Sequence, residues 1–210
     1  IKFTSKYILQ FAVILLGFEM NMASVIQVGK QSILVIFLTL TTAFLTSYYA
    51  GKRLQIHKKL AVLIGVGTAI CGGSAIAAAA PAIDADDQDI SFAISTVFLF
   101  NIIAVFLFPF AGHLMNLSDS GFGMWAGTAI NDTSSVVAAG YSYSNAAGNF
   151  ATIVKLTRSL MIVPITLALA IINARASKKQ NSNFNFLKVF PWFVAGFLVA
   201  AILNSTGLIS

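Results

Sequence analysis

The chain has 210 residues, of which 58% are hydrophobic and only 10% are charged. A soluble domain carries about 25% charged residues, so this chain has too few charges to cover an ordinary globular surface. The high apolar content excludes an intrinsically disordered chain, and the single cysteine excludes an intrachain disulfide framework. The composition predicts one all-α integral membrane domain that covers residues 1–210.

The net charge of +6 comes from 13 Lys and Arg residues against 7 Asp and Glu residues. In a membrane protein, such an excess is typical of loops that set the orientation in the bilayer. No nucleic-acid-binding motif accompanies it, so we expect the lipid bilayer as a partner and no nucleic acid. The chain begins at Ile1 and shows no signal-peptide pattern with a small-residue cleavage site.

Six segments are predicted as membrane spans, since a crossing needs about 20 mostly apolar residues. In chain order they are Gln31–Ala50, Leu60–Ile83, Ile90–Gly112, Gly121–Gly140, Phe150–Ala174 and Val189–Leu203. Before them, Tyr7–Phe18 is too short to cross alone, and Glu19–Gly29 is mixed and predicted to lie at an interface. We therefore expect a polytopic helical bundle of about six to seven membrane segments.

Charged residues gather in three of the predicted loops. The basic loops Lys52–Lys59 and Arg175–Lys188 each carry four Lys or Arg residues, whereas the acidic loop Asp84–Asp89 carries none. Because Lys and Arg are enriched in cytoplasmic loops, both basic loops are predicted to face the cytoplasm. If Leu60–Ile83 crosses the membrane, the acidic loop lies on the opposite side.

The sequence contains an internal repeat at an offset of 60 residues. GTAICGGSAIAAA at Gly67–Ala79 matches GTAINDTSSVVAA at Gly127–Ala139 at seven of thirteen positions. In the first copy a Gly-Gly step follows the GTAI block after Cys71, and in the second copy an Asn-Asp step follows it directly. In mid-membrane, either step frees backbone polar groups that hydrocarbon cannot satisfy. The repeat therefore predicts two broken helices, each buried in protein or lining a wet cavity.

Paired broken helices are typical of transporters, which place half-helix N-termini at a site near the middle of the membrane. Such N-termini suit anions, because their N–H groups are unpaired and carry partial positive charge. The candidate substrate-binding residues are Thr68, Gly72, Gly73, Ser74, Asn131, Thr133, Ser134, Ser135, Lys155 and Arg158.

An alternative interpretation is that the small residues only permit close helix packing, and Gly123 and Gly127 fit that pattern. The hydroxyl groups of Thr68, Thr128 and their neighbours can equally bond back to their own helices. The relation between the two repeat copies is also open. The predicted spans make them parallel, whereas an inverted pair needs one copy to be a re-entrant hairpin.

Three charged residues fall inside predicted spans. Asp132 lies near mid-membrane, where a carboxylate costs at least about 2.5–3.5 kcal/mol, so we expect it to couple a proton or a sodium ion. The alternative is that Asp132 caps the helix that follows it. Lys155 and Arg158 are three residues apart and share a helix face, from which they either attract an anion or reach the outer interface.

Other reactive residue types show no catalytic pattern. Cys71 is predicted to be a small packing residue, and His57 and His113 lie in predicted loops with no second ligand at metal-binding spacing. There is no nucleotide-binding loop and no nucleophile–base pair. We therefore expect no enzyme activity, no cofactor and no metal site.

Four motifs carry a resemblance to a known family. They are LLGFEM at Leu15–Met20, GTAICGGSAIAAAAP at Gly67–Pro81, FGMWAGTAINDTSSVVAAG at Phe122–Gly140 and ATIVKLTR at Ala151–Arg158. With them the chain resembles the YeiH-type sulfate exporter family of bacterial inner-membrane proteins, over nearly its whole length. The resemblance implies a multi-pass protein of the bacterial cytoplasmic membrane, of which this chain is a central portion. It also favours a functional role for Lys155 and Arg158.

The chain departs from this family pattern at two positions of the second repeat copy. The family usually has His where Asn131 stands and Gln where Ser135 stands. Asn cannot titrate near neutral pH, so a proton role for that His does not carry over. We predict secondary transport of a small anionic solute, sulfate-like or organic. The alternatives are an ion channel or a membrane protein without transport function, such as an embedded enzyme, and a homo-oligomer remains open.

Overall fold

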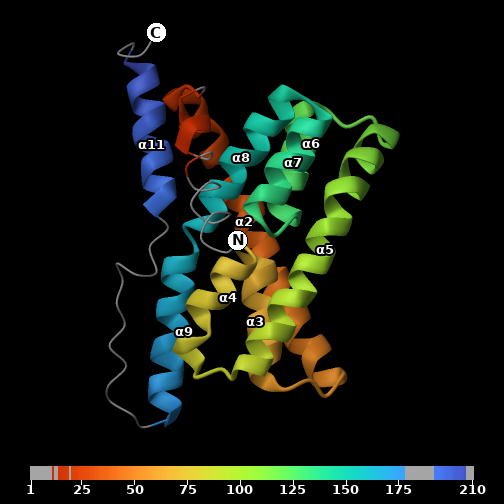
Figure 1. Ribbon diagram of the computed structural model, residues 1–210, viewed down its shortest axis with the longest axis vertical. Coiled ribbons are helices and arrows are strands. Elements are labelled where there is room, and N and C mark those ends of the chain that lie inside the picture. The colour runs from red at the N-terminus through yellow and green to blue at the C-terminus, as the bar shows by residue number, and fades with distance from the viewer. Residues whose placement is uncertain (1–10, 12–13, 19, 178–191, 207–210) are drawn as a thin grey trace.

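The computed structural model describes residues 11, 14–18, 20–177 and 192–206. Its helices are α2 (Met22–Arg53), α3 (Lys58–Ala69), α4 (Gly73–Ala79), the 3-10 helix η1 (Pro81–Ile83), α5 (Asp87–Leu114), α6 (Asp119–Ala129), α7 (Thr133–Tyr143), α8 (Asn145–Ser159), α9 (Ile162–Ser177) and α11 (Trp192–Ser205). No strand occurs among these residues, which confirms the all-α prediction. We call the end of the molecule at the bottom of Figure 1 the lower end and the other the upper end.

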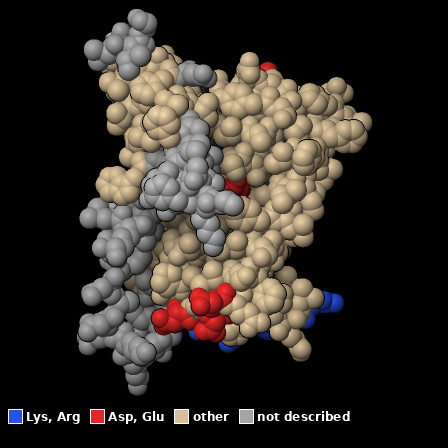
Figure 2. All heavy atoms as spheres, viewed as in Figure 1, with Lys and Arg blue, Asp and Glu red and all other residues tan. Residues whose placement is uncertain are grey.

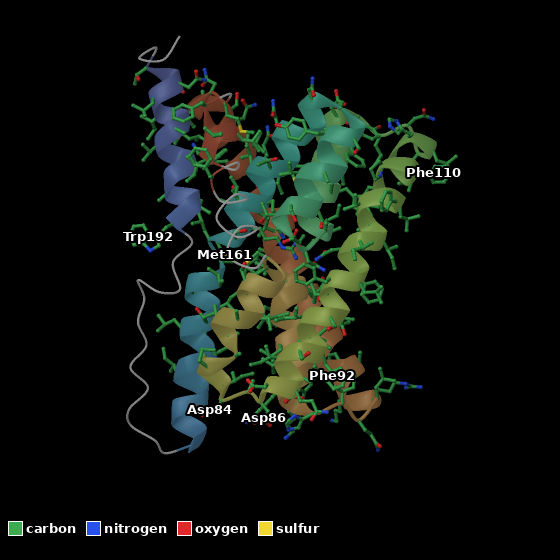
Figure 3. The ribbon with its side chains drawn as sticks, in the orientation of Figure 1. Asp84, Asp86, Phe92, Phe110, Met161 and Trp192 are labelled. Carbon is green, nitrogen blue, oxygen red and sulfur yellow. The ribbon has the colours of Figure 1, made fainter. Side chains whose placement is uncertain are left out.

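Three stretches of helix in the described part are long and apolar enough to cross a membrane: Met22–Arg53, Asp87–Leu114 and Asn145–Leu169. The second of these, α5, runs from the lower to the upper end (Figure 1). Its exposed residues Phe92 and Phe110 lie near opposite ends of the helix (Figure 3). An exposed apolar helix face of this length suits contact with lipid.

Helix α2 is the longest element, with 32 residues. The side chain of Asn21 accepts a hydrogen bond of 2.8 Å from Ala23 N–H and so caps its start. Lys52 and Arg53 lie in its last turn, where positive charge compensates the helix dipole. The segment Glu19–Gly29 is predicted to lie at an interface. From Met22 onward it forms the beginning of α2. Half of Tyr7–Phe18 lies outside the described residues.

The first repeat copy is a re-entrant hairpin. Helix α3 rises from the lower end, the chain turns at mid-height, and α4 with η1 returns to the same end (Figure 1). Lys59 Nζ donates a 2.5 Å hydrogen bond to the Asp84 carbonyl and closes the mouth of this hairpin. The prediction that Leu60–Ile83 crosses from one end to the other is therefore wrong, because the Gly-rich step reverses the chain.

The second repeat copy is a hairpin of the same kind at the opposite end. Helix α6 descends from the upper end and α7 returns to it (Figure 1). Ser144 Oγ donates a 2.6 Å hydrogen bond to Asp119 Oδ1 and closes this mouth. Asp119 and Ser144 stand 60 positions after Lys59 and Asp84, so the two closing pairs are equivalent in the repeat. The copies are thus inverted, and Gly121–Gly140 does not cross.

The predicted span Phe150–Ala174 consists of two helices. Helix α8 descends from the upper end to mid-height, and α9 continues to the lower end (Figure 1). Met161, at the break between them, lies at mid-height (Figure 3). At the edge of the molecule, α11 meets the start of α2, where Met22 N–H donates a 2.7 Å hydrogen bond to Ser205 Oγ. The first residues of the predicted span Val189–Leu203 lie outside the described part.

The acidic loop lies beside the first basic loop, which contradicts the predicted orientation. Figure 2 shows acidic and basic side chains at the same lower end, where Figure 3 places Asp84 and Asp86. His57 Nδ1 and Asp89 Oδ2 lie 2.7 Å apart and join the two loops. The prediction fails because the α3–α4 hairpin returns to the end from which it enters. Helix α9 also ends there, but the side chains of the second basic loop lie outside the described residues.

Candidate functional site

The candidate site lies where the tips of the two hairpins meet. The helices are interrupted at Ile70–Gly72 and at Ile130–Asp132, within a residue or two of the predicted positions. Gly72 has φ +69°, a left-handed conformation that favours glycine. A Cβ atom on Gly72 would lie 3.7 Å from the backbone C and O atoms of Asn131, so the two tips are in contact. This confirms the predicted pair of adjacent breaks.

Lys155 on α8 joins the two tips. Its Nζ atom donates hydrogen bonds of 2.8 Å to the Ile70 carbonyl and 3.1 Å to the Ile130 carbonyl. These two carbonyls stand 60 positions apart and are equivalent in the repeat. They are also among the last, unpaired carbonyls of α3 and α6, which carry partial negative charge. One ammonium group therefore caps the C-terminal ends of both half-helices.

Arg158 continues this arrangement one turn further along α8. Its Nε atom donates a 2.6 Å hydrogen bond to the Ala69 carbonyl, and its two terminal nitrogens donate to the Thr128 carbonyl at 2.5 Å and to the Thr68 carbonyl. Thr68 and Thr128 are again 60 positions apart. The planar guanidinium presents several donors in a fixed geometry, which suits three backbone acceptors on two chain segments.

Both cations are buried, with 0% of Lys155 and 2% of Arg158 exposed. The alternative interpretation, in which they reach the outer interface, is therefore wrong. No described carboxylate lies within 4.0 Å of either group. A buried charge is costly unless it is hydrogen-bonded, and here helix C-terminal carbonyls supply the partners. The site is thus a positively charged centre held between two helix ends, and its contact with a substrate stays a prediction.

Asp132 caps α7, as the alternative interpretation proposed. Its Oδ2 atom accepts hydrogen bonds from Ser135 N–H at 3.1 Å, from Ser135 Oγ at 3.3 Å and from Ser134 Oγ. A carboxylate at a helix N-terminus also interacts favourably with the helix dipole. These hydrogen bonds explain how a carboxylate is accommodated at the tip of the second hairpin. Its predicted role in coupling an ion stays a prediction.

Asn101 on α5 also belongs to the candidate site, and the sequence reasoning missed it. Its Oδ1 atom accepts hydrogen bonds from the backbone N–H groups of Asn131 at 3.1 Å and Asp132 at 3.3 Å. It thereby holds the tip of the second hairpin against α5. The available signal was its position, because Asn101 is the only polar side chain between Val97 and Gly112 and lies at the centre of the predicted span.

Two side-chain atoms at this junction lack a hydrogen-bond partner. They are Asn101 Nδ2, a donor, and Asn131 Oδ1, an acceptor, and both are buried. Asn101 is 2% exposed and Asn131 is 8% exposed. Most buried polar groups in proteins are paired, so two unpaired atoms on neighbouring residues mark this junction as unusual.

The remaining predicted residues also lie at or next to the hairpin tips, but in different surroundings. Thr133 is buried, Thr68 is half-buried, and Ser74 and Ser134 are exposed. The Thr128 hydroxyl bonds back to the Met124 carbonyl of its own helix at 2.7 Å, as the alternative interpretation proposed. A Cβ atom on Gly73 would lie 3.2 Å from the Phe98 ring, so this glycine sits against α5.

Gly123 and Gly127 serve the close packing that the alternative interpretation assigned to them. A Cβ atom on Gly127 would lie 2.8 Å from the Ala151 carbonyl oxygen, and one on Gly123 would lie 3.0 Å from the Ala147 carbonyl oxygen. Helices α6 and α8 therefore approach at backbone distance. This approach brings Lys155 and Arg158 within reach of the hairpin tips, so packing and site geometry are connected.

The cysteine lies in the first hairpin tip, and the two histidines lie away from the tips. Cys71 is a buried free cysteine in the first tip. His57 is half-exposed and faces Asp89 at the lower end, and the His113 ring stacks on Tyr143 with centroids 4.2 Å apart. Among the described residues, no group of three or more His, Cys, Asp or Glu side chains could hold a metal ion.

Comparison with known proteins places this chain in a family. The family model described as conserved hypothetical protein 698 matches residues 1–210. The chain belongs to this family. Neither the family's description nor the names of the relatives below states an activity. No solved structure matches the chain.

Several members of the conserved hypothetical protein 698 family can be compared in detail. A UPF0324 membrane protein of Clostridium tetani is 51% identical over 222 aligned residues, which cover 100% of this chain and 64% of the relative. A UPF0324 membrane protein of Fusobacterium nucleatum is 47% identical and one of Streptococcus agalactiae is 48% identical, each over 98% of this chain. The chain spans less than two thirds of the length of these relatives. These relatives are named as membrane proteins, and the described part of this chain has three helices long and apolar enough to cross a membrane. The chain is therefore a membrane protein.

Proposed function

We propose that the protein is a secondary transporter that moves a small anion across the bacterial cytoplasmic membrane. The observation that carries this proposal is the bridge made by Lys155 and Arg158 between repeat-equivalent carbonyls of two inverted hairpins. Inverted repeats that meet near the middle of the membrane are the common architecture of secondary transporters. A protein that only spans the membrane has no need for broken helices at that depth.

The inverted hairpins suggest how a solute passes. One hairpin opens toward the lower end and the other toward the upper end, so each tip is placed to control access from one side (Figure 1). Because one ammonium group contacts both tips, movement of one hairpin changes the contacts of the other. Alternating access needs such coupling, since opening both sides at once would let the solute leak.

The charge at the tips supports an anionic solute. Lys155 and Arg158 bring two positive charges to the centre of the molecule, and no carboxylate of the described residues contacts them. The N-terminal N–H groups of α7 add partial positive charge. Sulfate or a small organic anion, as the resemblance to the YeiH-type family suggests, fits this sign. Asp132 then serves to bind the coupling proton or sodium ion, which also offsets its repulsion of an anion.

Flux through reconstituted full-length protein tests the proposal. The protein is placed in proteoliposomes, and uptake of radiolabelled sulfate, phosphate and small carboxylates is measured with and without proton and sodium gradients. We expect saturable, gradient-dependent uptake of at least one anion. Unitary currents in a planar bilayer would instead favour a channel, and absence of both flux and current for all solutes would contradict a transport function.

A further inference from the structure

The unpaired atoms of Asn101 and Asn131 differ in hydrogen-bonding character. Asn101 Oδ1 is occupied by two backbone N–H groups, which fixes the orientation of this carboxamide and leaves Nδ2 as a donor. Asn131 Oδ1 is an acceptor without a partner. A ligand that satisfies both must offer one acceptor and one donor. Leaving either atom unpaired in a buried site is unfavourable, so the pair selects for a ligand with both groups.

This requirement separates the common inorganic oxyanions. Sulfate carries no proton at neutral pH, so its oxygens can accept from Asn101 Nδ2 but cannot donate to Asn131 Oδ1. Hydrogen phosphate and hydrogencarbonate keep an O–H group and can do both. A site built to pair with a ligand O–H group rejects the analogue without it, because a buried polar group is then left unpaired.

The charge balance at the tips agrees with a singly charged ligand. The two positive charges of Lys155 and Arg158 face the C-terminal ends of α3 and α6, which contribute roughly −0.5 elementary charge each. The Asp132 carboxylate contributes a further negative charge at the tip of the second hairpin. When the coupling proton or sodium ion neutralises Asp132, about one net positive charge remains, which a monovalent anion balances and a divalent anion exceeds.

We infer that the transported solute is a small oxyanion that keeps an O–H group, and that Asn101 and Asn131 recognise it. This inference rests on the proposed transport function. The oxyanion accepts a hydrogen bond from Asn101 Nδ2 and donates one from its O–H group to Asn131 Oδ1. Both atoms are closed off from solvent, so the solute reaches them when the tip of the α6–α7 hairpin separates from α5.

Phosphate and sulfate form a matched pair for the test, since both are tetrahedral and of similar size. Binding of each to the full-length protein in detergent is measured by calorimetry, and uptake of each is measured in proteoliposomes. We expect phosphate to bind at least about tenfold more tightly than sulfate and to be taken up faster. Hydrogencarbonate, which also keeps an O–H group, should compete with phosphate.

Two variants test the role of Asn131. Asn131→Leu is close in shape but removes the acceptor, so phosphate affinity should fall about tenfold or more while sulfate affinity stays or rises. Asn131→Asp keeps an acceptor, so this variant should keep the preference for phosphate. Its added negative charge should lower the affinity for both anions. Thr96→Val serves as a control, because Thr96 is on α5 and its hydroxyl bonds only to the Phe92 carbonyl of its own helix.

Each outcome decides the question. Equal or tighter binding of sulfate by the wild-type protein would overturn the inference and leave anion transport standing. A phosphate preference that survives Asn131→Leu would also overturn it, since Asn131 Oδ1 would then be paired with a structural water instead of the solute. Uptake of a solute that lacks an O–H group, with no uptake of phosphate or hydrogencarbonate, would overturn it as well. No flux for any solute would overturn the proposed function itself.

Discussion

Lys155 and Arg158 are unusual because both are buried cations that contact backbone carbonyls and, within the described part of the chain, no carboxylate. Burial of a charge in an apolar interior is expensive, and an exposed position would be cheaper. Both residues stay inside because the last carbonyls of α3 and α6 converge on the same side of α8. The last carbonyls of a helix lack intrahelical donors, and buried cations need acceptors. Each group therefore supplies the hydrogen-bond partner that the other lacks.

Removal of the Lys155 ammonium should destabilise the junction of the two tips. Lys155→Met keeps the length of the side chain but leaves the Ile70 and Ile130 carbonyls without this donor. Each unpaired buried group costs about 1–3 kcal/mol, so the midpoint of thermal unfolding in detergent should fall clearly. Lys30→Met is the control, because Lys30 is exposed on α2 and its loss should change stability by less than about 0.5 kcal/mol.

The opposite result for Lys155→Met is also informative. Replacement of a buried ion by an apolar side chain can stabilise a protein when the cost of burying the charge exceeds the gain from its contacts. A higher melting temperature for the variant would therefore contradict a clamping role. If such a stable variant had also lost flux, Lys155 would be needed for transport and not for stability.

Asp132→Asn should reduce transport more than it reduces stability. Asn is also a good N-cap residue and keeps the size of the side chain, so the cap on Ser135 N–H should survive within about 0.5 kcal/mol. The change removes the negative charge on which the proposed ion coupling depends. We expect a monodisperse protein in detergent whose gradient-driven flux falls about tenfold or more, measured in proteoliposomes. Flux near the wild-type level with both proton and sodium gradients would remove Asp132 from the mechanism.

At the scale of helices, the contact between α6 and α8 is the tightest feature of the candidate site. A side chain on Gly127 would meet the Ala151 carbonyl oxygen at 2.8 Å, and backbone atoms cannot move aside as a flexible side chain does. The separation of these helices determines whether Lys155 and Arg158 reach the second tip. The glycine therefore acts on the site through helix spacing.

Gly127→Ala should destabilise the protein by about 1–3 kcal/mol, the usual cost of adding a methyl group to a closely packed core. Gly29→Ala is the matched control, because a Cβ atom there meets only Thr157 Oγ1 at an ordinary 3.6 Å. That change should be neutral or slightly stabilising, since Ala is the better helix former. Thermal unfolding of both variants in detergent is the measurement. Equal melting temperatures would contradict close packing of α6 on α8.

The sequence indicated the hairpin tips but not the direction of the chain beyond them. The repeated GTAI block followed by Gly or polar residues located both breaks, because such steps cannot continue a helix in hydrocarbon. Whether the chain continues or reverses after a break depends on tertiary contacts such as Lys59 with Asp84. These contacts join residues 25 positions apart and leave no local pattern.

The same limit applies to individual residues of the candidate site. Lys155 and Arg158 could be singled out as charges inside a span, but their partners are backbone carbonyls, which every residue has. Asn101 could have been found as the only polar residue between Val97 and Gly112. Its role depends on the backbone N–H groups of Asn131 and Asp132, 30 and 31 positions away, and spacing alone does not reveal that contact.

For the whole molecule, the inverted hairpins define which loops share a side of the membrane. The end of α2, which carries Lys52, and the acidic loop at Asp86 both lie at the lower end, while the start of α6, which carries Ser120, lies at the upper end (Figures 1 and 3). The excess of Lys and Arg in the first basic loop predicts that the lower end is cytoplasmic. This arrangement differs from six simple crossings, in which Asp86 and Lys52 would lie on opposite sides.

Labelling of single cysteines in a Cys71→Ser background separates the two arrangements. Lys52, Asp86 and Ser120 are all exposed, so each can be replaced by cysteine without disturbing a buried contact. A membrane-impermeant maleimide applied to intact cells should label Ser120→Cys and spare both Lys52→Cys and Asp86→Cys. After permeabilisation all three should react, which controls for accessibility. Labelling of Asp86→Cys but not Lys52→Cys in intact cells would mean that the α3–α4 segment crosses the membrane, and the inverted pair of hairpins would be wrong.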